Sequence, residues 1–361
     1  MSAEAATVET PILTDPLAAR RQAQIFRLAF GMALSAGIAF GLAWPLAFLT
    51  PVITAKLLTL PRVLPVKAGV GFLVILSVSM ILSRELLVPT LEFPAVHLLL
   101  TGLILFLLFY VKAGGANPIL VVLLMLGVLL VPLAGTVSIT LATWVTEGLI
   151  FATAVGIAMH YITAALFPDP RVVEGSRVAA GESSEATGEG SQVPGSPQVR
   201  SALALRSLVV IFPLAAGFQL FSLVEFMVAL IMATLLALEP EFGKHLKVGK
   251  GLILANLVGG LIAVGIYRLL VWVPSFTFFL LLVFLGGLWM GGHIFSERLL
   301  GKLLGAGITT VFLILGPVIT GEAVAGVELL IRLGLIMGAV VYVVLAFGLL
   351  ERLTRGRRLA P

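Results

Sequence analysis

Glu147 is an acidic residue inside an apolar segment, and it has the clearest potential for chemistry in the chain. It lies in the run TWVTEGLIFATAVGIAMHYITAALF, residues 143–167, which is long enough to cross a bilayer. A carboxylate in hydrocarbon costs several kcal/mol unless it is paired, hydrated or protonated. Glu147 is therefore a candidate ion-pair partner and a candidate proton-binding group.

Arg332 is the predicted partner of Glu147. The late helices of the two halves correspond with an offset of 185 residues, which takes position 147 to position 332. Three readings follow. The two residues form a structural ion pair that fixes packing. Alternatively, a proton arriving at Glu147 releases Arg332 to bind an organic anion. In the third reading Glu147 extends to the nearby membrane surface.

Four further charged residues are candidates for substrate binding or coupling. Glu225 begins an apolar segment, and we interpret it either as a solvated loop charge or as a proton-collecting group. Arg27 and Arg206 each precede an apolar run, as interface anchors or as cations that attract anions. Lys56 lies within a short apolar segment, where its ammonium either extends to the surface or binds a substrate anion.

Several uncharged or weakly basic side chains also fall inside apolar segments. Thr101, Gln219 and Asn256 either bridge helices or line a polar path, and the bridge is the simpler reading. His160 is predicted to hydrogen-bond between helices, with a proton relay to Glu147 as the alternative. The two are 13 residues apart, about 20 Å along a helix, so they cannot touch.

Enzymatic chemistry finds no support in the sequence. There is no cysteine, no phosphate-binding Gly-rich loop ending in Lys and Ser or Thr, and no metal-ligand spacing among the four histidines. We expect neither an enzyme nor a bound cofactor or metal.

The elements that carry these residues are predicted to be membrane helices. The chain has 361 residues, of which 60% are hydrophobic and 11% charged, and its mean hydropathy of +1.15 excludes a soluble globular protein. Apolar runs without a barrel's alternation predict an all-α polytopic membrane protein of about 12 transmembrane helices. They lie near 25–43, 45–60, 66–83, 94–111, 117–134, 142–166, 204–220, 223–238, 250–270, 274–291, 300–318 and 324–349.

The basic residues predict the orientation of these helices. With both termini in the cytoplasm, all but four of the 23 lysines and arginines fall at the cytoplasmic side. The exceptions are Arg84 and Arg268 on the other side, and Lys56 and Arg332 within helices. This bias predicts a multi-pass protein of the bacterial inner membrane.

The chain divides into two similar halves around a polar linker. Residues 1–24 form a cytoplasmic tail, 25–167 the first six helices, 168–203 a flexible cytoplasmic linker, 204–350 the last six helices and 351–361 a basic cytoplasmic tail. Landmark residues recur in the same order in both halves, which predicts two parallel six-helix repeats. The pairs are Arg27 and Arg206, Pro61 and Pro240, Lys67 and Lys250, Arg84 and Arg268, Pro94 and Pro274, and Pro132 and Pro317.

Residues 27–72 and 205–252 carry a resemblance to a known family. Each begins with an Arg-led helix, continues with a short helix ending in a basic loop with Pro, and leads into a Lys-led helix. This order resembles the fusaric acid resistance, or aromatic acid exporter, superfamily. The chain departs from its larger members because only the linker stands where they carry a soluble cytoplasmic domain.

The resemblance implies a proton-coupled exporter of small organic or aromatic acids that works with a periplasmic adaptor protein. The alternative is a non-transporting membrane scaffold or assembly subunit of an envelope complex. The expected partners are the lipid bilayer, an adaptor and further copies of the chain, without nucleic acid.

Overall fold

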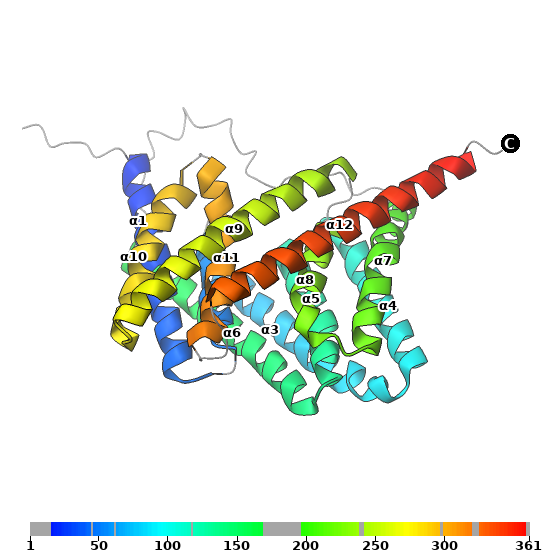
Figure 1. The fold of residues 1–361 in the computed structure, drawn as a ribbon, viewed down its shortest axis with the longest axis horizontal. Coiled ribbons are helices and arrows are strands. Elements are labelled where there is room, and N and C mark those ends of the chain that lie inside the picture. Colours follow the sequence, from blue (N-terminus) through cyan, green and yellow to red (C-terminus); the bar gives the residue numbers. More distant parts are fainter. Residues whose placement is uncertain are drawn as a thin grey trace, which may run out of the picture.

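The fold is all-α in a computed structural model that describes residues 16–44, 46–60, 63–116, 118–168, 196–237, 242–296, 299–319 and 325–358. Twelve α-helices lie within these ranges (Figure 1). They are α1 (Pro16–Gly41), α2 (Leu49–Leu58), α3 (Val66–Leu82), α4 (Pro94–Ala113), α5 (Pro118–Gly135), α6 (Ile139–Leu166), α7 (Pro197–Leu220), α8 (Met227–Ala237), α9 (Phe242–Trp272), α10 (Phe276–Ile294), α11 (Leu299–Ile319) and α12 (Ala325–Arg358). Short helical turns η1 (Ser83–Leu87) and η2 (Pro89–Glu92) join α3 to α4, and η4 (Val224–Phe226) precedes α8.

The twelve predicted helices are all present, but their lengths differ. Eight segments of the described chain are long and apolar enough to cross a membrane. By contrast, α2 has 10 residues and α8 has 11. At a rise of 1.5 Å per residue such helices reach about 15 Å, roughly half of the hydrocarbon thickness. The protein is therefore a multi-pass membrane protein in which α2 and α8 are too short to cross alone.

The helix boundaries follow from local signals. Pro16, Pro94 and Pro197 stand at the first position of α1, α4 and α7, where a proline costs no helical hydrogen bond. Ser138 caps α6 by accepting a hydrogen bond from the Leu141 amide at 3.0 Å. α1 and α7 both begin earlier than predicted, inside the predicted tail and linker. The rest of the linker, residues 169–195, lies outside the described residues.

Helices from the two halves of the chain pack together. α1 lies against α10, and α4 lies against α7; the two pairs stand on opposite sides of Figure 1. α2 packs on α6, α8 packs on α12, and the long helices α9 and α12 run side by side across the bundle (Figure 1). The two halves of the sequence are thus interlocked in space.

The buried core reflects this interlocking. One cluster joins Leu28 of α1 and Val52 of α2 to Phe279 of α10 and Phe312 of α11. A second cluster joins residues of α4 and α5 to residues of α7, α8 and α12. Neither cluster belongs to one half of the chain, so each half contributes to burying the other.

Candidate functional site

Glu147 lies on the exposed face of α6. The exposed side chains of α6 are mainly apolar and include Trp144, 49% exposed, and Ile162, 42% exposed; Glu147 is also exposed. One turn further along α6, the Phe151 ring stacks on Trp44 with 4.3 Å between ring centroids. The carboxylate therefore sits on the outer surface of the bundle, beside an aromatic pair.

The predicted pairing of Glu147 with Arg332 stays a prediction. Arg332 falls on α12, and its side chain is outside the described part of the structure. α6 packs mainly on α2 and α5, whereas α12 packs mainly on α9 and α8. The two helices thus belong to different groups in the bundle.

Arg27 is buried at the end of α6. Its side chain is 7% exposed, and its Nε donates a hydrogen bond of 2.8 Å to the Phe167 carbonyl. Phe167 is the residue that ends α6. A guanidinium at a helix C-terminus satisfies a carbonyl that has no helical partner and lies at the negative end of the helix dipole.

Lys56 and Arg206 each contact a second helix. Lys56 joins the two halves of the chain, and Arg206 joins two helices of the second half. The Lys56 ammonium donates a hydrogen bond of 2.9 Å to the Gly305 carbonyl, which joins α2 to α11. The Arg206 guanidinium carbon lies 5.7 Å from the centroid of the Phe347 ring, a cation–π contact between α7 and α12. These contacts hold helices together and place cations inside the bundle.

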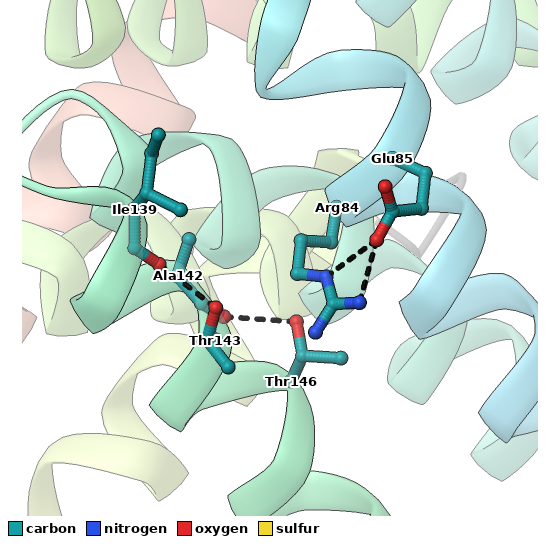
Figure 2. A network of polar contacts seen from close by, with 6 residues as sticks. All are labelled: Arg84, Glu85, Ile139, Ala142, Thr143 and Thr146. Atoms are coloured by element: carbon teal, nitrogen blue, oxygen red, sulfur yellow. Dashed lines mark hydrogen bonds and ion pairs between the residues drawn. The ribbon is translucent and has the colours of Figure 1, made fainter.

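The acidic residues Glu225 and Glu85 are exposed in the short turns that connect helices. Glu225 lies in η4, the three-residue turn before α8. In η1, Glu85 accepts a hydrogen bond of 2.8 Å from the Arg84 Nε. Figure 2 shows the Arg84 side chain directed from η1 toward the first turns of α6, where Thr146 bonds back to the Ala142 carbonyl. An exposed ion pair of this kind adds little stability.

His160 hydrogen-bonds to the backbone before α3. Its ring is 4% exposed, and its Nε2 accepts a hydrogen bond of 3.1 Å from the Leu64 amide. The ring therefore carries its proton on Nδ1, which is buried without a partner among the described residues. His160 positions the segment that enters α3.

A buried polar cluster around His97 was not singled out by sequence reasoning. The ring of His97 is 2% exposed in the first turns of α4 and contacts Thr90, Thr101 and Gln219. Gln219 comes from the last turn of α7, so the cluster joins α4 to α7. A lone histidine has no spacing that marks it in a sequence; only the expectation that Thr101 and Gln219 bridge helices pointed this way.

The bridging expected of Asn256 is present between α9 and α11. The Thr310 hydroxyl donates a hydrogen bond to the Asn256 side-chain oxygen, and the Asn256 amide nitrogen bonds back to the Leu252 carbonyl at 2.8 Å. Nearby, Gly259 and Gly307 bring the two backbones into contact. Small residues and a polar bridge at one crossing are typical of membrane helix pairs.

Metal ligands do not gather in the described residues: no group of three or more His, Asp or Glu side chains is placed to hold an ion there. What the arrangement offers instead is buried hydrogen-bonding groups and cations between helices.

Comparison with known proteins gives one match. Residues 24–163, which run from α1 into α6, match the family described as Protein of unknown function (DUF2955). No curated protein and no solved structure matches the chain. The predicted relation to the fusaric acid resistance superfamily stays a prediction.

Proposed function

We propose that the chain is a secondary, proton-coupled exporter of small organic or aromatic acids in the bacterial inner membrane. The observation that carries the proposal is the set of polar groups buried where helices from the two halves of the chain meet. His97 contacts Gln219 across α4 and α7, and Lys56 contacts Gly305 across α2 and α11. Buried polar and ionisable groups in a membrane protein are costly, and they most often mark a transport path.

The two halves form parallel six-helix repeats in this proposal, and the packing supports it. Replacing each helix of the first six by its counterpart in the last six turns the α1–α10 pair into α7–α4, and the α2–α6 pair into α8–α12; all four pairs are packed. Ala43 and Ser222 both have left-handed backbones, with φ of 49° and 53°. They are 179 residues apart, the same separation as Arg27 and Arg206. Such strained turns at matched positions are rare by chance.

Two interlocked repeats provide a means of transport. In transporters built from repeats, one bundle rocks against the other around a site between them. Here the contacts that would change are α1–α10 and α4–α7, together with the α2–α11 contact that holds Lys56. With both termini cytoplasmic, Arg27, Arg206 and Lys56 attract an organic anion from the cytoplasm. Glu147 lies nearer the start of α6, and it exchanges protons with the opposite side of the membrane.

A membrane scaffold is the second candidate, and the position of Glu147 favours it. The predicted coupling carboxylate lies on an exposed, largely apolar face of α6. The basic candidates each have a structural contact on a different helix pair. A scaffold would use the exposed face of α6 to bind an envelope protein, such as the periplasmic adaptor, or a further copy of the chain.

Reconstituted liposomes test the exporter. An inward proton gradient is imposed across vesicles that hold the purified protein, and the movement of radiolabelled benzoate is followed. The native protein is expected to exchange protons for benzoate, and Glu147→Gln to lose the response to the gradient while retaining passive exchange. Glu92→Gln changes an exposed acid in η2 and serves as the matched control. Gradient-driven exchange that is equal in all three proteins makes Glu147 structural. No exchange in any of them, with an adaptor present, favours the scaffold.

A further inference from the structure

The Nδ1 atom of the His97 ring faces two hydrogen-bond acceptors. Its Nδ1 lies 2.9 Å from the Thr90 hydroxyl oxygen and 3.2 Å from the Leu87 carbonyl. The Thr90 hydroxyl donates its own proton to the same Leu87 carbonyl at 2.7 Å. Both oxygens can therefore only accept from the ring, so Nδ1 carries a proton.

The other side of the ring faces the side chain of Gln219. His97 Nε2 lies 3.0 Å from the Gln219 Oε1 and 3.4 Å from the Thr101 hydroxyl. A carbonyl oxygen is an acceptor, so this contact is a hydrogen bond only if Nε2 is also protonated and the ring is an imidazolium. Meanwhile the Gln219 Nε2 is buried without a hydrogen-bond partner among the described residues.

The amide of Gln219 has two orientations that correspond to two protonation states of His97. With its oxygen toward the ring, it accepts from the imidazolium and leaves its own nitrogen unsatisfied. With its nitrogen toward the ring, it donates to a neutral Nε2. Because exchanging the amide oxygen and nitrogen changes the shape of the side chain very little, the proton on His97 decides which orientation is stable.

Charged residues lie on the elements around His97, but among the residues that the structure describes none of them contacts His97 or Gln219. On the elements packed against α4 they are Arg84 and Glu85 of η1, which pair with each other, and Glu92 of η2, which is exposed. α5 carries no charged residue. Lys112, Arg200 and Arg206 lie toward the opposite ends of α4 and α7, about 20 Å or more along the helices from His97 and Gln219. The acceptors at His97 are therefore neutral, and no carboxylate fixes its charge.

The location of the cluster gives the proton a structural effect. The pair α4–α7 is one of the contacts that join the first six helices to the last six, together with α1–α10, α2–α11 and the contacts of α5 with α7 and α8. At the α1–α10 contact the rings of Phe40 and Phe279 meet edge to face at 5.4 Å between centroids. An aromatic pair is insensitive to pH, whereas the α4–α7 contact holds a buried imidazole that can gain or lose a proton.

We propose that His97 and Gln219 form a proton-binding site that couples protonation of the ring to the contact between α4 and α7. The ligand is a proton that enters from the end of the bundle where η2 joins α4. The proposal goes beyond the exporter and does not need it, because the site can titrate in a protein that transports nothing.

Nuclear magnetic resonance of the histidine rings tests the site directly. The chain has four histidines, so His97→Gln identifies the ring resonances of His97 in nitrogen-labelled protein held in nanodiscs. Between about pH 5 and pH 9, Nδ1 is expected to stay protonated while Nε2 loses its proton. Gln219→Glu supplies an anionic acceptor and should keep the ring doubly protonated to higher pH. Gln219→Leu removes the acceptor and should leave Nε2 unprotonated at lower pH.

Asn256→Leu is the matched control, since it removes a buried amide from α9 and should leave the His97 resonances unchanged. The chain has no cysteine, so spin labels can be attached at Leu99→Cys and Leu220→Cys, two exposed positions on α4 and α7. Their distance distribution should change with pH in the native background and stay constant with Gln219→Leu. A His97 Nε2 that keeps one state over this pH range, or that responds equally in all Gln219 variants, overturns the proposal. A titrating ring with a constant distance overturns the coupling.

Discussion

Individual side chains in this protein are placed less by their charge than by the backbone groups they satisfy. Arg27 caps α6, Lys56 binds a carbonyl of α11, and His160 accepts from the backbone before α3. In a membrane interior, a carbonyl or amide without a partner costs several kcal/mol, so long basic side chains are well suited to helix ends and irregular segments. Arg27 and Lys56 can bind an anion only if they give up these bonds to backbone carbonyls.

Glu147 gives a residue-scale prediction about stability. Because the side chain is exposed on α6, Glu147→Gln is expected to change the free energy of unfolding by no more than about 0.5 kcal/mol. Denaturation of the purified protein in detergent measures the change. A loss of several kcal/mol would instead identify Glu147 as a buried partner, and the double change with Arg332→Gln would then be milder than the sum of the two.

At the scale of single helices, the α9–α11 crossing depends on the glycines at the contact, Gly259 and Gly307. A Cβ at Gly259 would overlap the carbonyl oxygen of Gly307, whereas a Cβ at Gly265, on the same helix, meets nothing within 4 Å. Gly259→Ala is expected to destabilise the protein by about 1–3 kcal/mol, because one helix must move away from the other. Gly265→Ala should be neutral or stabilising, since alanine is the better helix former. Thermal unfolding of both variants measures the difference, and equal effects would contradict this packing.

Helix positions could be predicted from the sequence because lipid demands long apolar runs, and all twelve appear where the runs lie. Their partners could not. An apolar run shows that a helix is buried in lipid or protein, but it does not distinguish the α1–α10 contact from a contact within one half. For the same reason, the position of Glu147 within an apolar run did not indicate which face of α6 it occupies. His97 was missed because the partner that joins it to another helix, Gln219, is 122 residues away in the sequence.

Orientation is a property of the whole molecule, and the basic residues predict it. A reporter active only in the periplasm should stay silent after Arg358 or within the linker near Gly190. The same reporter inserted after Val273, in the exposed turn between α9 and α10, is the positive control and should be active. Activity near Gly190, or silence after Val273, would contradict the orientation.

Interlocking of the two halves predicts how the whole molecule assembles. The two largest core clusters each combine helices from both sides of the linker, so each half alone would expose much of the apolar surface that these clusters bury, although a third cluster lies within the first half. If the chain is divided within residues 168–203 and both fragments are produced together, they should associate and copurify through a tag on one of them. Each fragment produced alone should aggregate or be degraded, since α1 would lack α10 and α4 would lack α7.

As a control, a fragment pair divided within α9, between Gly259 and Gly260, cuts a core helix and should fail to assemble. Stable, monodisperse halves from the linker division would mean that each six-helix unit folds by itself, and that the contacts across α1–α10 and α4–α7 are dispensable for stability.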